Sequence, residues 1–396
     1  MLALLLLGRT VQRIPPLWNW DVLGYMALAL EWTEDDPVEV HRATYDAARS
    51  DLEPAVFREL TDQRVEVRRA RFQDAEAFTE HIAFYRARVL FTLLTRLLHG
   101  AGAPLPYAVW WLSLAAFAGT ALLICRWLAG RTSLWSAVLG GLLLAHAPPL
   151  LVTARFATAD GLGTLLACLG AYFLLERRRA RVGAALLTIS ILTRPDAVIL
   201  IGILAVALLW FERGAADRLG LRFHGLWLLA SALAYLGVQS FAGEYGWWPL
   251  FQISFAGKAV HPAALPTEVD WTLYRAVLDA KLAEIPGGGY WSTPRLVSGS
   301  TFAFVYLGFG VIALGLLGRR LRDPRFGRHL ALLAALGATY FLRWFLFPQL
   351  WDRFLAPVYV LVPLVIVSLV ALARERDDAD ADQNASKAVT PAMTSS

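Results

Sequence analysis

Residues 107–128 read YAVWWLSLAAFAGTALLICRWL, and this stretch decides the fold class. Apart from Arg126 near its end it carries no charge. A helix needs about 20 apolar residues to cross the hydrocarbon core of a bilayer, so Tyr107–Leu128 predicts a transmembrane helix. Of the 396 residues, 57% are hydrophobic and 17% are charged, against about 25% charged residues in an average soluble domain. We therefore expect an all-α polytopic membrane protein.

Similar apolar segments recur on either side of this one. We place further transmembrane helices at Leu134–Thr153, Gly161–Leu175, Val182–Leu192, Val198–Phe211, Leu226–Ala242, Phe302–Leu317, Leu330–Phe347 and Phe354–Leu372. The apolar start, Met1–Leu7, has no basic segment before it and makes a poor signal peptide. It predicts a shortened first helix, or one completed through Arg9–Ile14. The expected bundle has about ten transmembrane helices within residues 1–372.

Arginines mark one side of this bundle. They fill alternate short loops, at Arg126, Arg131, Arg177, Arg178, Arg179, Arg181, Arg213, Arg218, Arg222, Arg319, Arg320, Arg322, Arg325 and Arg328. Cytoplasmic loops are rich in Lys and Arg, so these loops are expected inside. Residues 15–106 and 243–299 then form two long outer loops of a multi-pass protein, and a bacterial plasma membrane would suit this layout. The acidic tail, residues 373–396, is expected to be cytoplasmic and disordered.

The first outer loop has a helical pattern. Asp21–Trp32, Pro37–Arg49 and Pro54–Leu60 each begin with a residue suited to a helix start. Glu76–His99 mixes apolar with basic residues, and its latter part predicts a helix lying in the membrane interface. If Glu76–His99 crossed the membrane instead, the long N-terminal segment would be cytoplasmic.

The composition also excludes several classes. The slight excess of Lys and Arg, 37 against 32 Asp and Glu, is explained by the cytoplasmic loops and does not indicate nucleic-acid binding. Cys125 and Cys168 lie inside apolar segments, so no disulfide framework is expected. No spacing of Cys and His predicts a metal site.

Several short motifs are expected at the outer face. They are Trp20-Asp21 followed by Gly24-Tyr25, Asp160 opening an apolar helix, Thr193-Arg194-Pro195-Asp196, Glu244-Tyr245-Gly246, Gly257-Lys258 and Asp352-Arg353-Phe354. In order and layout this arrangement resembles the GT-C superfamily of membrane glycosyltransferases. That superfamily includes protein O-mannosyltransferases, aminoarabinose transferases and bacterial arabinosyl- and mannosyltransferases. The first helix is short, and no large soluble domain follows residue 372 in this sequence, so the resemblance identifies no acceptor.

The resemblance implies an inverting transfer of a sugar from a polyprenyl-phosphate donor to a glycan, lipid or protein acceptor. Such a step needs a carboxylate as general base and cations around the leaving phosphate. It implies Asp21 as the base, with Asp160 assisting. For the donor phosphate it implies Arg194, Arg353, Lys258, Arg86 and Arg88, and for the acceptor or sugar Tyr25, Tyr245 and His261. No metal ligands are assigned, and arginine and lysine suffice to neutralise a monophosphate, although a divalent ion is compatible with the mechanism. No cofactor is expected.

Structural roles compete with each of these assignments. Asp21 and Asp160 are both placed to cap helices. Arg194 has Asp196 nearby as an ion-pair partner, and Arg353 has Asp352. The competing functions are a transporter or lipid flippase, which would carry charged residues in the middle of facing helices, and an inactive scaffold relative.

Overall fold

The computed structural model describes residues 14–211, 218–243, 245–257, 259–284, 324–348 and 352–389. These residues form helices, and within them the β structure is one isolated bridge between Leu17 and Phe156. The all-α prediction is confirmed for this part of the chain. The predicted helix Phe302–Leu317 and the start of the chain before Ile14 lie outside it.

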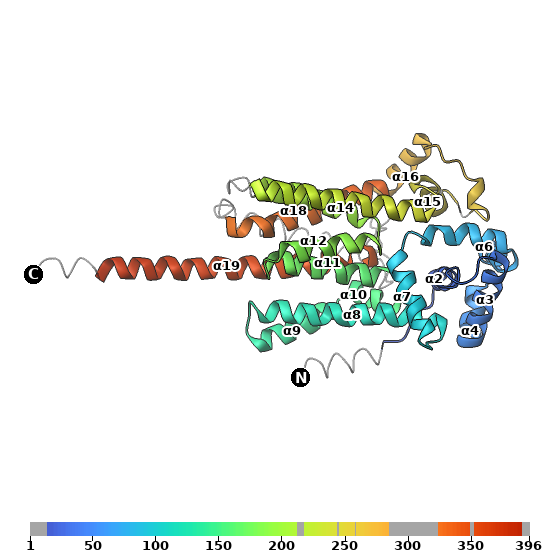
Figure 1. Ribbon diagram of the computed structural model, residues 1–396, viewed down its shortest axis with the longest axis horizontal. Coiled ribbons are helices and arrows are strands. Elements are labelled where there is room, and N and C mark those ends of the chain that lie inside the picture. Colours follow the sequence, from blue (N-terminus) through green and yellow to red (C-terminus); the bar gives the residue numbers. More distant parts are fainter. Residues whose placement is uncertain are drawn as a thin grey trace, which may run out of the picture.

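The bundle is built from long helices that run side by side (Figure 1). They are α8 (Leu105–Ala129), α9 (Leu134–Ala145), α10 (Pro148–Arg155), α11 (Asp160–Leu175), α12 (Ala180–Ile191), α13 (Ala197–Phe211), α14 (Arg218–Ala242), α18 (Pro324–Leu346) and α19 (Ala356–Val389).

Four stretches in the described ranges are long and apolar enough to cross a membrane, namely Leu105–Ala129, Gly220–Ala242, Phe326–Leu346 and Arg353–Gln383. A fifth candidate is the pair α9 and α10, which is bent by 63°. The bend follows from Pro148 and Pro149, because proline cannot continue the hydrogen-bond ladder of a helix. These helices indicate a membrane protein, and the count of about ten crossings stays a prediction because α11, α12 and α13 are shorter.

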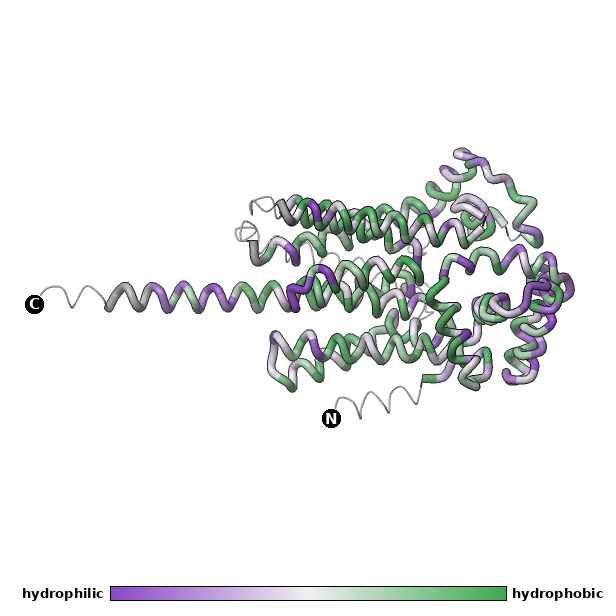
Figure 2. The backbone as a smooth tube through the Cα atoms, in the orientation of Figure 1, coloured by the Kyte–Doolittle hydropathy of each residue, from purple (hydrophilic) through white to green (hydrophobic). Residues whose placement is uncertain are grey.

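The predicted outer loops form a separate layer at one end of the bundle. Its helices are α2 (Asp21–Leu30), α3 (Pro37–Asp51), α4 (Pro54–Leu60), α5 (Glu66–Gln73), α6 (Ala75–Ile82), η1 (Ala83–Tyr85), α7 (Val89–Gly100), α15 (Trp247–Phe255), η2 (Pro262–Ala264) and α16 (Trp271–Glu284). Figure 1 places both loops at this end, whereas the last turns of α19 extend from the opposite end. Polar residues concentrate in α3 to α6 and in the part of α19 that extends from the bundle, and apolar residues dominate the bundle (Figure 2).

The segment Glu76–His99 is broken rather than continuous. It comprises α6, η1 and α7, and α7 has 12 residues. Such a helix is about 18 Å long, less than the roughly 30 Å of hydrocarbon core that a crossing requires. The interfacial placement of this segment stays a prediction, since α12 has the same length and is predicted to cross.

The C-terminal tail differs from our expectation of disorder, because α19 continues as a helix to Val389. Beyond the apolar part, the sequence ARERDDADADQ contains the good helix formers Ala, Arg, Glu and Gln between its aspartates, and Arg376 lies 3.7 Å from Asp380 one turn later. Local propensity added to an existing helix end explains the extension, since propagation is easier than nucleation.

Helices α11 and α12 are in close contact through two glycines. A Cβ atom added at Gly183 would lie 2.7 Å from the carbonyl oxygen of Gly170 and 2.9 Å from the backbone nitrogen of Leu174. Backbone atoms cannot move aside as a flexible side chain can, so only glycine permits this approach. The contact keeps the N-terminal end of α11 next to the turn that follows α12, where the charged residues described below meet.

Gly183→Ala is therefore expected to destabilise the protein by about 1–3 kcal/mol, the usual cost of overpacking. Gly202→Ala in α13 is the matched control, because a Cβ there meets nothing within 4 Å. The control is expected to leave stability unchanged or slightly raised. Apparent melting temperatures of the purified variants in one detergent measure both, and equal values would contradict this packing argument.

Candidate functional site

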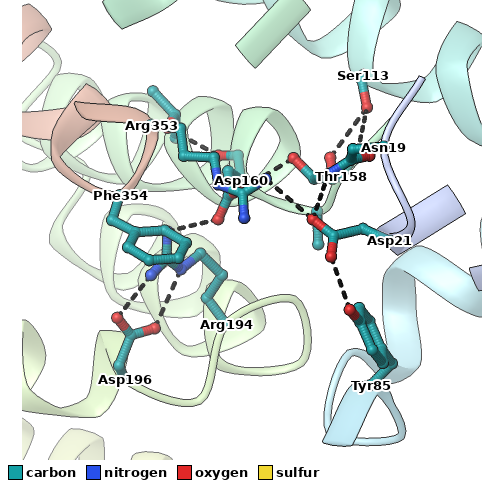
Figure 3. A network of polar contacts seen from close by, with 12 residues as sticks. Asn19, Asp21, Tyr85, Ser113, Thr158, Asp160, Arg194, Asp196, Arg353 and Phe354 are labelled. Atoms are coloured by element: carbon teal, nitrogen blue, oxygen red, sulfur yellow. Dashed lines mark hydrogen bonds and ion pairs between the residues drawn. The ribbon is translucent and has the colours of Figure 1, made fainter. Parts of the chain in front are cut away.

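Asp21 is the first residue of α2, and its carboxylate does not cap the helix, because Trp20 occupies the cap position and no side chain bonds the free amides there. Its Oδ1 atom accepts a hydrogen bond from the Tyr85 hydroxyl at 2.6 Å. Its Oδ2 atom accepts from Asn19 Nδ2 at 2.6 Å and from Arg353 Nη1 at 3.0 Å. The capping alternative for Asp21 is therefore wrong, and the carboxylate belongs to a tertiary network (Figure 3).

Asp160 opens α11 and is likewise free of a capping role. Its Oδ1 atom accepts from Arg194 Nη1 at 2.7 Å, and its Oδ2 atom accepts from Thr158 Oγ1 at 3.0 Å. The same Oδ2 atom lies 3.5 Å from Arg353 Nε. Arg353 thus bridges the two carboxylates that the sequence singled out.

Arg194 joins the network from the turn between α12 and α13. Besides Asp160 it contacts Asp196 through a bidentate pair, with Nε–Oδ1 at 3.1 Å and Nη2–Oδ2 at 2.8 Å. The expected pairing with Asp196 is present, but it is one part of a larger arrangement. Arg343, from α18, extends the chain with its Nε atom 3.3 Å from Asp196 Oδ2.

The aromatic ring of Phe354 organises the guanidinium groups. Its centroid lies 4.8 Å from the Arg194 carbon Cζ, 4.6 Å from that of Arg343 and 5.1 Å from that of Arg353. Cations favour the face of an aromatic ring, so Phe354 helps to hold three like charges close together. We call Asp21, Asp160, Asp196, Arg194, Arg343 and Arg353 the ion network; its formal charges balance.

The network is largely removed from solvent. The side chains of Arg194, Arg353 and Asp160 are 14%, 12% and 9% exposed. Burial raises the pKa of Asp21, but the positive charge of Arg353 and the hydrogen bonds from Tyr85, Arg353 and Asn19 outweigh it, and the pKa lies below its usual value. The pKa of Tyr85 is raised well above 10 by burial and by the neighbouring Asp21 charge, so this phenol is a hydrogen-bond donor at neutral pH.

Two further predicted residues lie beside the network. The Tyr25 hydroxyl accepts a hydrogen bond of 3.4 Å from the Ala159 amide, and its ring meets that of Tyr85 edge-on at 5.3 Å. Arg88 donates to the Phe84 carbonyl, and its Cζ atom lies 5.2 Å from the Tyr85 ring centroid. Within the described ranges Arg88 forms no ion pair, so its charge is available to an anionic ligand.

Three other predicted residues are not brought to the network. Arg86 pairs with Glu31 at 2.8 Å, and Tyr245 stacks near Phe84 with centroids 4.9 Å apart. His261 lies 3.5 Å from Glu80 and 3.8 Å from Asp74. Lys258 lies outside the described residues.

Arg86 and Tyr245 instead line a cavity of about 340 Å³ between the two predicted outer loops. Its other walls come from Ala83, Ala242, Gly243, Pro249, Pro262, Ala263, Leu265 and Thr267. The Glu80 carboxylate accepts a hydrogen bond of 3.0 Å from the Ala263 amide, which ties the later loop to the first one. Two consecutive residues connect the cavity with the ion network. Tyr85 donates a hydrogen bond to Asp21, and Arg86 lines the cavity.

A second, smaller cavity of about 70 Å³ borders the network on the bundle side. Arg194, Asp196 and Arg343 contribute its polar wall. Its apolar wall comes from α11, α13, α18 and α19 and includes Ala167, Leu200, Leu336, Leu355 and Val358. The lining of the cavity thus combines charged side chains with hydrocarbon.

Sequence reasoning missed Tyr85, Asn19 and Arg343 as partners, and treated Asp196 as a structural residue. An arginine in the apolar segment Leu330–Phe347 was the available signal for Arg343, since such residues are costly unless paired. In the part of the chain that the structure describes, no group of three His, Cys, Asp or Glu residues is arranged to hold a metal ion. Comparisons with protein-family models, curated proteins and solved structures give no match.

Proposed function

We propose that the protein is an inverting glycosyltransferase that takes a sugar from a polyprenyl-phosphate donor and passes it to a hydroxyl acceptor at the outer face of the membrane. The observation that carries the proposal is the ion network, which joins carboxylates and guanidinium groups from segments up to 332 residues apart at the end of the bundle where both long loops gather.

The network supplies the groups that this reaction needs. A carboxylate accepts the proton of the acceptor hydroxyl, and guanidinium groups offset the charge that develops on the departing phosphate. Arginine suits phosphate because its fork of donors matches two phosphate oxygens at once. The proposed base is Asp21, and the proposed phosphate ligands are Arg353, Arg194 and Arg88.

We assign the first part of the polyprenyl chain to the cavity beside Arg194 and Arg343, because much of its lining is apolar. Its lining from α13, α18 and α19 continues the bilayer-facing bundle, so a lipid would keep its hydrocarbon in an apolar setting while its phosphate meets the arginines. The charged residues that line this cavity lie at helix ends and not in the middle of facing helices. This position favours the transferase over an ion-coupled transporter.

The proposal is tested by supplying the purified protein in nanodiscs with a panel of polyprenyl-phosphate sugars, with and without candidate glycan acceptors. Released polyprenyl phosphate is measured by mass spectrometry. Release that depends on both the donor sugar and an added acceptor is expected. Release from no donor, by protein that remains monodisperse and folded, would contradict the proposal.

The larger cavity is the proposed acceptor pocket, because an aromatic ring beside a charged pair suits the apolar face and the hydroxyl groups of a sugar. Tyr245→Ala is expected to raise KM for the acceptor about three- to tenfold, the worth of one aromatic contact, with kcat little changed. Tyr107→Ala, which alters a ring in the first turn of α8 that does not line the cavity, is the control. Steady-state kinetics with the acceptor found in the panel distinguish the two, and an unchanged KM in the Tyr245 variant would place the acceptor elsewhere.

A further inference from the structure

Arg353 serves two carboxylates at once. It donates a hydrogen bond of 3.0 Å to Asp21, and its Nε atom lies 3.5 Å from Asp160. Asp160 has two other donors, Arg194 and Thr158, at 2.7 and 3.0 Å. If Arg353 moved to another anion, Asp160 would therefore stay satisfied, whereas Asp21 would lose its cationic partner.

In the resting arrangement Asp21 is poorly placed to act as a base. Three donors, from Tyr85, Asn19 and Arg353, already occupy its two oxygens. A carboxylate has about four lone-pair sites, so one position at most remains for an acceptor hydroxyl. Its ion pair with Arg353 also stabilises the unprotonated form and so weakens its attraction for a proton.

The contact of Arg353 with Asp21 involves fewer hydrogen bonds than the contact of Arg194 with Asp196. Arg194 makes three hydrogen bonds to two aspartates, including the bidentate pair with Asp196. Arg353 reaches Asp21 through a single nitrogen, and it belongs to the short helix η4 (Asp352–Leu355) that precedes α19. A phosphate can accept two parallel hydrogen bonds from one guanidinium group, whereas Asp21 accepts one from Arg353.

We propose that a phosphate monoester bound at the network takes Arg353 from Asp21, so that ligand binding itself releases the Asp21 carboxylate to accept a proton. This inference rests on the proposed function for the nature of the ligand, and it adds an order of events. Donor binding comes first and prepares the base, and the acceptor then meets a carboxylate with an open oxygen. Without donor, Asp21 stays paired and the acceptor hydroxyl is not activated.

The groups that face Asp21 make the exchange measurable as proton uptake. On the first loop they are Asn19, Tyr25, Arg71 and Tyr85, and on the bundle side Arg353. Arg88, Asp160 and Arg194 lie one contact further away, beside Tyr25, Tyr85 and Arg353. Moving the Arg353 charge to a phosphate leaves Asp21 buried with neutral donors, and burial raises the pKa of a carboxyl group. Near pH 5 the ligand-bound protein is then expected to hold more protons than the free protein.

The test is titration calorimetry of nanodisc-embedded protein with farnesyl phosphate near pH 5, in buffers of different ionisation enthalpy. The dependence of the heat on the buffer gives the protons taken up per ligand. Asp21→Asn removes the contribution of Asp21 and keeps that of the phosphate itself, so the difference between the two proteins isolates the exchange. Wild type is expected to take up a larger fraction of a proton, up to one per ligand. Asp46→Asn, which changes an exposed side chain of α3, is expected to match wild type.

Equal proton uptake by wild type and Asp21→Asn, or no binding of farnesyl phosphate by wild type, would overturn the exchange. If Asp21→Asn does not fold, Tyr85→Phe takes its place in the experiment. This variant keeps Arg353 and removes one hydrogen-bond donor to Asp21. Its ligand-linked proton uptake is therefore expected to persist and to extend to higher pH. Uptake with an unchanged pH dependence would likewise overturn the inference.

Further titrations identify which phosphate compound is the ligand, and they distinguish failure of the exchange from failure of the proposed function. Inorganic phosphate and phosphatidylglycerol are titrated in the same way, and uptake with farnesyl phosphate in excess of both identifies the lipid monoester as the ligand. Uptake that depends on Asp21 without sugar transfer from any donor would leave the exchange standing and the glycosyltransferase proposal refuted. Transfer that depends on Asp21 without the difference in uptake would do the reverse.

Discussion

Replacing Asp21 with asparagine is expected to reduce kcat for sugar transfer by about 10²- to 10⁴-fold, which is the range that a positioned general base contributes. Asparagine is nearly the same size, and its one amide oxygen can accept the hydrogen bond from Tyr85 as Oδ1 does in wild type, while the amide nitrogen replaces the Oδ2 atom that accepts from Asn19 and Arg353. It cannot take the proton of the acceptor hydroxyl. Because Arg353 keeps its contact with Asp160, the variant retains a carboxylate near each guanidinium group and is expected to insert and fold.

The measurement is acceptor-dependent release of polyprenyl phosphate by wild type and Asp21→Asn in matched nanodiscs. Asp35→Asn, in an exposed turn of the first loop, is the control and is expected to transfer at the wild-type rate. Gel filtration and a thermal melt establish that each variant is folded. Transfer by Asp21→Asn at more than about a tenth of the wild-type rate would exclude Asp21 as the base, since it would leave too small an effect for proton transfer.

Hydrophobic patterning predicted most of the bundle because the signal is local. Tyr107–Leu128 corresponds to α8, Leu105–Ala129, and Leu134–Thr153 corresponds to α9 and α10 with their break at Pro148. The number of crossings could not be fixed in the same way. Whether α12, with 12 residues, spans the bilayer depends on how its neighbours and the turn after it sit in the membrane, and no local pattern encodes that.

Four of the six residues of the ion network, Asp21, Asp160, Arg194 and Arg353, were predicted as site residues from the sequence, whereas the contacts between them were not. Asp21 and Arg353 are 332 residues apart, and a single sequence gives no reason to pair them. From the sequence alone, structural roles that involve neighbours in the chain, such as helix capping or a local ion pair, therefore had as much support as the functional roles. For Arg194 the neighbour Asp196 is indeed a partner, together with Asp160, whereas for Asp21 the helix cap proposed from its position is absent.

Tyr85 and Arg343 show what local reading overlooks. The sequence assigned no role to Tyr85, whose hydroxyl reaches Asp21 from η1. It assigned none to Arg343 either, and this residue joins the network because α18 brings it to Asp196. In both residues the side-chain type was compatible with a site, and only tertiary packing decided that it belongs to one.

The largest loss of stability is expected from Arg194→Gln. This change removes three hydrogen bonds and leaves Asp160, which is 9% exposed, with Thr158 and the 3.5 Å contact of Arg353, while Asp196 keeps Arg343. Removing one partner of a buried ion pair costs about 3–5 kcal/mol, and the remaining arginines reduce this to about 2–4 kcal/mol. Arg42→Gln, in an exposed pair with Glu39, is the control and is expected to have no measurable effect.

The double variant Arg194→Gln with Asp160→Asn tests the cause of that loss. If an uncompensated Asp160 charge produces most of it, neutralising the aspartate is expected to recover part of the stability, and the two changes will be less than additive. Apparent melting temperatures of the four proteins in one detergent complete the cycle. A fall in Arg194→Gln no larger than that of Arg42→Gln would mean that the network is hydrated and contributes little to folding. Additive falls would mean that Arg194 stabilises the turn through Asp196 alone, and Asp160 would then be paired with Arg353 in the functional state.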